Sequence, residues 1–237
     1  MRIAAAILVL ASLVCLAQPP AFEVASVRLA DQSATYRPPT ASPDSFTVRN
    51  MTLRDCIQTA YEMPRTNVTG PEWLNDVRLD IVAKASGPAD DKRLHLMLRT
   101  LLAERLALKV HIDRKEMSVY AVTVAKGGPK FSESTTEGAP VFAQTKAEMN
   151  LQRVSASELA LILTQAFGRP VVDATGLKGR YDIHLDMTPF MNNPGSEDIV
   201  DIMMTALKEQ MGLRVESRKE AIDILVVDHA EKTPTEN

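Results

Sequence analysis

Two stretches of the chain show the hydrophobic spacing of an amphipathic helix, one at about residues 90–107 and one at about 196–211. In both, apolar residues recur at i, i+3, i+4, i+7, i+8 and i+12, which predicts one face packed against a core. The first stripe is Leu94, Met97, Leu98, Leu101, Leu102 and Leu106, and the second is Ile199, Ile202, Met203, Ala206, Leu207 and Met211. The two stripes superimpose at a constant offset of 105 residues.

Matching segments follow the two helices. The first helix runs into LALKVHI and the second into MGLRVES, both typical of strands. A charged tripeptide RKE comes next in each case, followed by a second apolar strand, VYAVTVA (119–125) or IDILVVD (222–228). We therefore expect two separate strands after each helix.

Matching segments also precede the helices. TLRD (52–55) and SASE (155–158) place a hydroxyl three residues before an acid, the pattern of a capping box at a helix start. Each capped helix leads into a hairpin-like segment, and the two segments share the pattern Arg-x-Asp-Ile, at 78–81 and 180–183. The order strand, helix, hairpin, helix and two further strands thus occurs twice.

This pattern predicts an α+β fold of two tandem pseudo-repeats, each with helices packed on a mainly antiparallel sheet. We place the repeats at residues 45–126 and 148–230. Residues 18–44 should hold an N-terminal strand and a Pro-rich loop. The Gly-, Pro- and Ser-rich segment 127–147 reads as a linker, and 231–237 as a C-terminal tail.

The first residues have the pattern of a secretory signal peptide. One Arg precedes an apolar run from Ile3 to Val14, which is too short for a comfortable membrane span. We expect cleavage near Ala17, a signal peptide of residues 1–17, no transmembrane segment afterwards, and a secreted or periplasmic protein. Lipid anchoring at Cys15 is the less favoured alternative, because Val14 stands where a small residue is expected.

Composition narrows the classes of function. A formal net charge of −3 and an aromatic content of 5% argue against a nucleic-acid partner. The sequence contains no P-loop, GxGxxG, CxxC or GxSxG motif, so we predict no cofactor and no catalytic residues of a known type. After cleavage Cys56 is alone, on the apolar side of its helix, which predicts a buried thiol and no intramolecular disulfide.

Six segments, in this order, carry a resemblance to a known family: FEVASVR, GPEWL, LLAERLALKVH, VYAVTVAKGGPK, GRPVVDATGLKGRYDIHLD and ILVVDHAEKTPTEN. Together they resemble the soil-associated protein family, which is abundant in acidobacteria and of unknown function. The resemblance covers nearly the whole mature chain and implies export and a repeated domain, but no activity or site residue.

Two further comparisons are more distant. The order of elements is similar to that of the small modules preceding secretin and TonB-dependent receptor channels, which bind or position other proteins. This comparison rests on element order alone. Some relatives resemble the extracellular part of penicillin-sensing membrane peptidases, but the chain has no HExxH motif.

The segment GRPVVDATGLKGRYDIHLD (168–186) is the most motif-like part of the chain. Asp182, His184 and Asp186 alternate with apolar residues, and such residues lie about 7 Å apart along a strand, too far to converge easily on one ion. We therefore predict no metal site. In the loop, Gly176 and Gly179 permit a turn in which Asp173 or Thr175 bonds nearby amides, so the whole segment is interpreted as a hairpin.

The binding candidates are Trp73, Asp173, Thr175 and Arg180. The favoured hypothesis is an exported, non-enzymatic module that recognises a protein, peptide or envelope component through a sheet edge or hairpin loops. The alternative is an envelope hydrolase using Asp173 and Asp182 with His184. A structural spacer within a larger assembly is a third hypothesis, which the sequence does not separate from the first.

Overall fold

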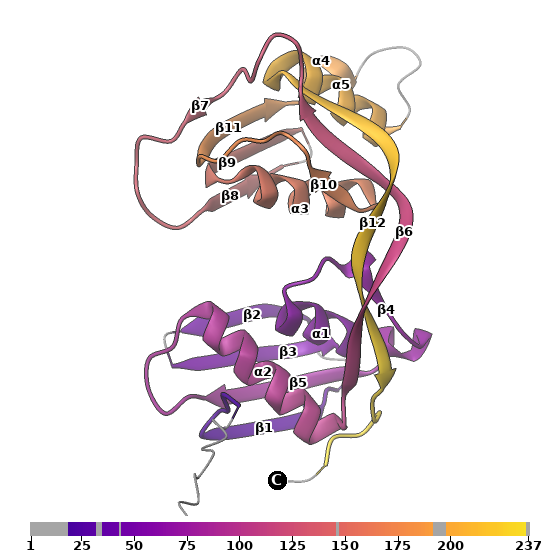
Figure 1. Cartoon of the computed structure of the whole chain (residues 1–237). Coiled ribbons are helices and arrows are strands. Elements are labelled where there is room, and N and C mark those ends of the chain that lie inside the picture. Colours follow the sequence, from indigo (N-terminus) through magenta and orange to yellow (C-terminus); the bar gives the residue numbers. More distant parts are fainter. Residues whose placement is uncertain (1–18, 32–34, 43, 146, 192–197, 236–237) are drawn as a thin grey trace, which may run out of the picture.

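In the computed structural model, residues 19–31, 35–42, 44–145, 147–191 and 198–235 are described. They form two α+β lobes joined by a long two-stranded ribbon (Figure 1). The predicted signal peptide and Cys15 lie outside the described residues. No helix of the described part is long and apolar enough to cross a bilayer.

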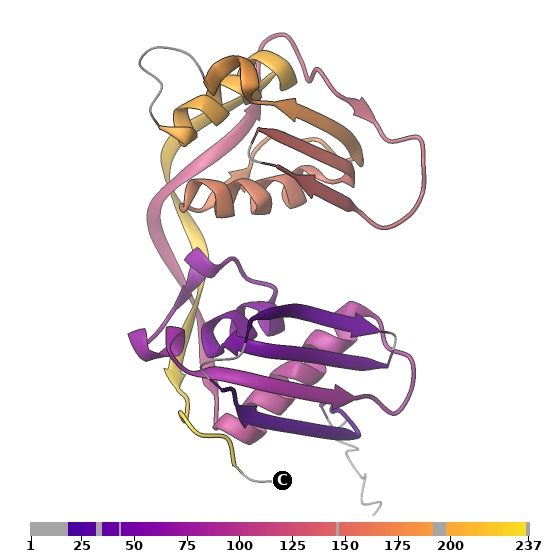
Figure 2. The same cartoon turned by 180° about the vertical axis from the view of Figure 1, so that it is seen from behind.

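Lobe 1 is built on a four-stranded antiparallel sheet with the order β1-β5-β3-β2. Its strands are β1 (Val24–Leu29), β2 (Arg37–Ser42), β3 (Ser45–Thr52) and β5 (Arg78–Lys84). Helices α1 (Leu53–Tyr61) and α2 (Asp91–Leu106) belong to the same lobe. Helix α2 lies across one face of the sheet, and Figure 2 shows the strands from the other face. Alternate residues of β5 are buried against the helices, as the period of a strand requires.

Lobe 2 has a second antiparallel sheet, with the order β7-β11-β9-β8. Its strands are β7 (Ser132–Glu133), β8 (Val141–Gln144), β9 (Glu148–Val154) and β11 (Tyr181–Asp186). Its helices are α3 (Ala156–Phe167), α4 (Thr188–Met191) and α5 (Ile199–Met211). Leu163 of α3 and Leu207 of α5 are buried in one core with Leu151 and Ile183 of the sheet.

The ribbon consists of β6 (Lys109–Val124) and β12 (Leu213–His229), paired antiparallel along almost their whole length. Two short strands complete this third sheet by parallel pairing: β4 (Val68–Thr69) with β12, and β10 (Val171–Asp173) with β6. The 3-10 turns η1 (Arg65–Asn67) and η2 (Glu72–Asn75) flank β4.

Each long strand begins in one lobe and ends in the other. Strand β6 follows α2 of lobe 1, and its Val122 is buried in the core of lobe 2. Strand β12 follows α5 of lobe 2, and its Leu225 and Val227 are buried in the core of lobe 1. The core of each lobe therefore depends on a strand that arrives from the other half of the chain.

The α+β class with mainly antiparallel sheets is confirmed. Every residue of the first predicted helical stripe is buried in α2. In the second stripe all but Ile199 are buried, and Ile199 is the exposed first residue of α5. The cap at Ser155 is a full capping box, whereas at Thr52 the hydroxyl accepts from the backbone of Asp55. Cys56 is buried in lobe 1, and this burial raises the pKa of its thiol well above its usual value.

Two predictions about strands were wrong. The first concerns the tripeptides RKE, which do not separate two strands, because β6 and β12 run through them without a break. Arg218 pairs with Val119 and Glu220 with Met117 in the middle of the ribbon. This part of the ribbon crosses between the lobes, and neither lobe covers it. Its charged residues therefore indicate a strand exposed to solvent rather than a turn between two strands.

The second error concerns the hairpins. Strands β10 and β11 do not pair with each other: β10 lies in the ribbon sheet and β11 in the sheet of lobe 2. The same holds for β4 and β5. The glycine-containing loop of 174–180 therefore carries the chain from one sheet to another. The pairing of β10 with β6 spans about fifty residues of sequence, and local patterns do not encode such non-local pairing.

The segment 127–147 also differs from the expected linker, because it supplies both edge strands of lobe 2, β7 and β8. Both strands are short and exposed, so they leave no periodic hydrophobic pattern in the sequence.

Candidate functional site

Asp173 and Thr175 hold the loop between β10 and β11. The Asp173 carboxylate accepts hydrogen bonds from the backbone N–H of Thr175 at 2.9 Å and from its hydroxyl at 2.7 Å. The Thr175 hydroxyl in turn accepts from the backbone of Leu177 at 3.1 Å. This is an Asx-type turn. Both side chains, predicted as binding candidates, are engaged within their own loop, as the turn interpretation expected.

Arg180 is part of a clamp around a β-bulge. In β9, Arg153 has a left-handed conformation with φ 57°, and the register against β11 shifts beside it. Arg180 donates to the backbone carbonyl of Arg153 at 2.6 Å, and Asp182 accepts from the backbone N–H of Arg153 at 2.9 Å. The bulged peptide is thus held from both sides, and Arg180 serves the sheet.

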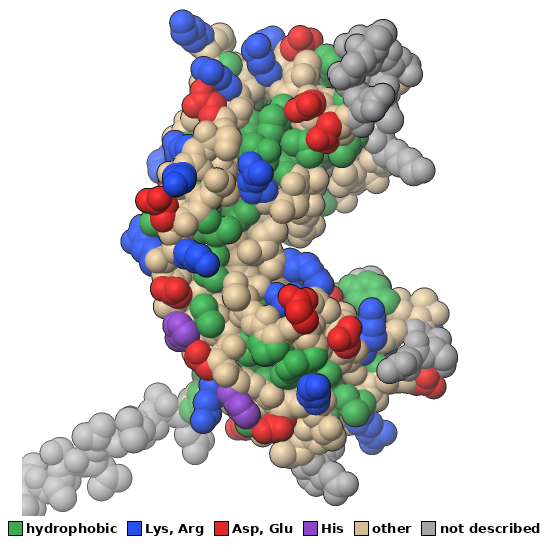
Figure 3. Space-filling view, turned by 90° about the vertical axis from the view of Figure 1, so that its right-hand side faces the viewer, with side chains coloured by type: hydrophobic (Ala, Val, Ile, Leu, Met, Phe, Trp, Pro, Cys, Tyr) green, Lys and Arg blue, Asp and Glu red, His purple; other side chains and the backbone are tan. Residues whose placement is uncertain are grey.

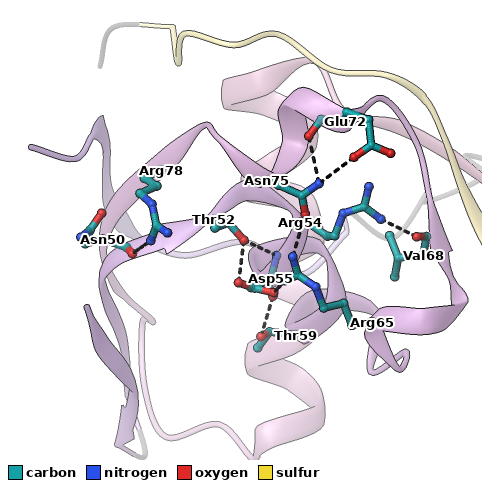
Figure 4. Close-up of polar contacts among 10 residues, drawn as sticks. All are labelled: Asn50, Thr52, Arg54, Asp55, Thr59, Arg65, Val68, Glu72, Asn75 and Arg78. Atoms are coloured by element: carbon teal, nitrogen blue, oxygen red, sulfur yellow. Dashed lines mark hydrogen bonds and ion pairs between the residues drawn. The ribbon is translucent and has the colours of Figure 1, made fainter. Parts of the chain in front are cut away.

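Lobe 1 contains the same clamp at the corresponding strand. Asn50 of β3 has φ 52°, and its N–H donates to Asp80 at 2.9 Å. Its carbonyl accepts from Arg78 at 2.9 Å, and Figure 4 shows these two residues side by side. The register of β3 against β5 shifts at this point. The shared Arg-x-Asp pattern therefore has a structural explanation: it satisfies both backbone groups of a residue that bulges out of the sheet.

The three residues proposed for the hydrolase alternative do not belong to one sheet. Asp173 ends β10 of the ribbon sheet, whereas Asp182 and His184 lie on the exposed side of β11 in lobe 2. His184 Nδ1 is 2.6 Å from the side-chain oxygen of Asn150. Asp186 accepts from the backbone of Thr188 at 2.8 Å, and bonds to the hydroxyl and N–H of Thr188 hold the pKa of this carboxyl below its usual value. Within the described ranges, no three acidic, His or Cys side chains are placed to hold a metal ion.

Trp73 lies in lobe 1, whereas the other binding candidates lie near β10 and β11. It belongs to η2, packs half-buried against the lobe 1 core, and has the ammonium group of Lys232 5.3 Å from its ring centroid. A cavity of about 360 Å³ adjoins this corner. The structure therefore does not bring Trp73, Asp173, Thr175 and Arg180 together in one site.

A cleft of about 560 Å³ lies between the lobes, and Figure 3 shows the notch that separates them. Tyr36, Gln58 and Thr66 line it from lobe 1, and Gln165 and Gly168 from lobe 2. Its surface is mainly neutral, because side-chain amides and hydroxyls predominate over charges.

The one acid lining this cleft, Asp55, is held in a network at the start of α1 (Figure 4). Its carboxylate accepts from the Thr52 hydroxyl at 2.6 Å and from the guanidinium of Arg65. Arg65 also donates to Asn75 at 2.7 Å, which ties α1 to both 3-10 turns. Asp55 is thus bonded to the Arg65 guanidinium and to the Thr52 hydroxyl, and these bonds fix this wall of the cleft.

A groove of about 370 Å³ lies between β8 and α3, and we call it the β8–α3 groove. Phe142 of β8 and Leu161 of α3 are 54% and 45% exposed, high values for such large apolar side chains. The residues lining the groove are Phe142, Ala143, Gln144, Leu151, Glu158, Leu161, Ile162 and Gln165.

Strand β8 is the open edge of the lobe 2 sheet. It pairs with β9 on one side and with no described strand on the other. Phe142 stands opposite the buried Leu151, so it projects from the face of the sheet that α3 covers. An edge with unpaired backbone groups therefore borders an apolar groove. Gln165 lines both this groove and the cleft between the lobes.

Two features of the sequence indicate this groove, although neither forms a motif. Val141 and Phe142 form an apolar pair within the Gly- and Pro-rich segment that was read as a linker. Leu161 lies outside the buried stripe of α3, which is Ala156, Leu159, Ala160, Leu163 and Thr164. A single exposed apolar residue is ordinary, but Leu161 and Phe142 line one groove together, and exposed apolar patches mark interaction sites.

The fold and this groove define a two-lobed α+β protein with exchanged long strands and an open strand edge. The chain belongs to a family described as a protein of unknown function (DUF3738), whose model matches residues 54–230. No curated protein and no solved structure matches the chain. The family description states no activity, so no residue role can be transferred from it.

Proposed function

We propose that this protein is an exported binding module that recognises an extended peptide segment of an envelope or extracellular protein. The peptide would add to the sheet of lobe 2 as a strand next to β8, with an apolar side chain in the β8–α3 groove. The observation that carries the proposal is the open edge of β8 directly beside that groove.

Strand addition would use both sides of the groove, the open edge of β8 and the apolar surface of α3. An added strand gains affinity from main-chain hydrogen bonds, and pockets for alternate side chains give it specificity. Phe142 and Leu161 stand on the two walls of the groove. Because both are about half exposed, an apolar peptide side chain between them would remove their remaining surface from water.

The polar residues favour binding over hydrolysis. Asp173 bonds its own loop, Asp182 clamps a bulge, and His184 contacts Asn150. A hydrolase needs such groups to converge on one reacting atom. Because these three side chains are held in separate structural contacts, they support a binding module better than a hydrolase.

The proposal retains the predicted duplication. Its support is the common order strand, helix, short strand, strand, helix, long strand, as in β3–α1–β4–β5–α2–β6 and β9–α3–β10–β11–α5–β12. The two Arg-x-Asp clamps are a second support. In this view one unit was copied, and the copy in lobe 2 carries the peptide site.

The test begins with a random peptide display library selected on the mature protein. A selected peptide, synthesised with a fluorescent label, is then titrated by fluorescence anisotropy. Leu161→Glu should weaken its binding about tenfold or more, because burial of a leucine side chain contributes about 1.5–3 kcal/mol. Ile199→Glu is the matched control: Ile199 is 46% exposed in the same lobe but does not line the groove.

Strand pairing is tested on the peptide itself. N-methylation of one residue at a time should abolish binding at alternate positions, because only every second residue of an added strand points its N–H at β8. Failure to select any peptide, tolerance of N-methylation throughout, or equal losses for both Glu variants would contradict the proposal. A concentration-dependent dimer that Leu161→Glu dissociates would overturn it in favour of edge pairing between two copies.

A further inference from the structure

Another pocket, of about 560 Å³, lies where β6 ends and β12 begins in lobe 2. The turn after β6 forms one side of it, and the end of α5 and the start of β12 form the other. Four cationic side chains line it: Lys126, Lys130, Lys208 and Arg214. No acidic residue of the described part of the chain lines it. We call it the basic pocket.

The positive charge of the basic pocket is only partly compensated. Lys130 donates to the backbone carbonyl of Glu209 at 2.7 Å, which leaves its charge and two of its protons available. Arg214 is 3.0 Å from the carboxylate of Glu216 through Nε. Lys126 and Lys208 make no hydrogen bond or ion pair within the described part of the chain. A chain with a net charge of −3 thus concentrates cations at one concave place.

The backbone of the turn adds donors to these cations. The N–H of Gly128 bonds the carbonyl of Ala125 at 2.9 Å and closes the turn around Lys126 and Gly127. The amides of those two central residues bond no described carbonyl. A side chain at Gly127 would meet nothing within 4 Å, so the space above it is open. Unpaired amides beside lysines are the usual elements of a phosphate site.

We propose that the basic pocket binds a phosphate-bearing ligand of the diphosphate class. Four cations on two sides of a pocket match several anionic oxygens better than one carboxylate, which has two. The ligand could be a soluble phosphorylated molecule or the phosphate of a lipid headgroup, because both present the same group. The pocket shares no lining residue with the β8–α3 groove, so this inference stands independently of the peptide proposal.

The probe is inorganic pyrophosphate, titrated into the mature protein by isothermal calorimetry at about 0.15 M salt, where attraction between exposed charges more than about 8 Å apart is largely screened. Saturable binding at one site is expected, and sodium acetate should not compete. The double variant Lys126→Ala/Lys208→Ala should weaken binding about tenfold or more.

The double variant Lys92→Ala/Lys178→Ala is the control, since it removes the same charge from two exposed positions outside the pocket and should bind normally. No saturable binding of pyrophosphate, or equal losses for both double variants, would overturn the proposal. Co-sedimentation with phosphatidylcholine vesicles, with and without cardiolipin, whose headgroup carries two phosphates, separates the sources. Binding only to the anionic vesicles, lost in the Lys126/Lys208 variant, identifies a headgroup, and pyrophosphate binding without vesicle binding identifies a soluble ligand.

Discussion

The outer strands β2 of lobe 1 and β8 of lobe 2 occupy corresponding places. Each lies at an edge of its sheet, next to the strand that leads into a capped helix, β3 before α1 and β9 before α3. Strand β2 has the sequence RPPTAS, with two successive prolines, whereas β8 has VFAQ and no proline.

This difference changes what each edge can do. Proline has no N–H to donate and is found on edge strands, where it discourages pairing with another chain. Lobe 1 therefore carries a protected edge at β2, and lobe 2 carries an edge whose amides are all present. The apolar groove borders the unprotected edge, which is the arrangement expected if lobe 2 accepts a strand and lobe 1 does not.

The frameworks of the two lobes are by contrast much alike. Both contain a bulged residue with positive φ, Asn50 or Arg153, clamped by an Arg-x-Asp pair. The lobes thus differ at the edge strands β2 and β8 rather than in how each sheet is built. A difference in function between the lobes is expected at those edges and at the pockets beside them.

The largest effect is expected from core substitutions, one in each lobe. Leu102→Ala and Leu163→Ala each remove a fully buried side chain and should lower the free energy of unfolding by about 2–5 kcal/mol. Because each core includes residues of a strand from the other half, either change should destabilise both lobes together. Urea unfolding followed by Trp73 fluorescence and by far-UV circular dichroism measures this.

Trp73 is the single tryptophan and reports on lobe 1, whereas circular dichroism reports on both lobes. The two transitions should coincide, even for Leu163→Ala in lobe 2. Separate midpoints would show that the lobes unfold independently and would contradict the coupling through the ribbon.

The two bulge clamps give an intermediate effect that should differ between lobes. Asp80→Ala leaves the N–H of buried Asn50 without its carboxylate partner and should cost about 1–3 kcal/mol. Asp182→Ala removes the same bond at an exposed position, where water replaces it, and should cost less. Thermal unfolding compares them. Equal losses would indicate that burial does not distinguish the two clamps, and a larger loss for Asp182→Ala would reverse the comparison.

The smallest effect concerns Asp186, the last residue of β11; the last residue of β5 in lobe 1 is Lys84. Bonds to Thr188 lower the pKa of Asp186 in the folded state. A depressed pKa stabilises the protein at pH above the unfolded value, and this contribution is lost as the pH falls through the folded pKa. Asp186→Asn should therefore reduce the loss of stability on the acid side. Carboxyl NMR titration should place the Asp186 midpoint below that of an unfolded peptide, and a normal midpoint would contradict the assignment.

Much of the local structure could be predicted from the sequence. The stripe of α2, the cap at Ser155 and the alternation of Tyr181, Ile183 and Leu185 are all present, because each depends on residues a few positions apart. The buried state of Cys56 followed from the same helical period.

The errors arise where distant segments meet. Val171 pairs with Tyr120 and Val68 with Leu225, and no local sequence pattern indicates either pairing. Local patterns therefore place β10 and β4 in hairpins that do not form. The groove was missed because β8 has four exposed residues and no buried face of its own. The basic pocket was missed because Lys126 and Lys208 are brought together only by the fold.

The exchange of β6 and β12 also sets an order of events during synthesis. A growing chain emerges from its N-terminus, and domains usually fold in that order. Lobe 1, although it comes first, lacks Leu225 and Val227 until β12 has been made. Its completion must wait for the later half of the chain. Until then the part of the lobe 1 core that these two side chains fill stays incomplete.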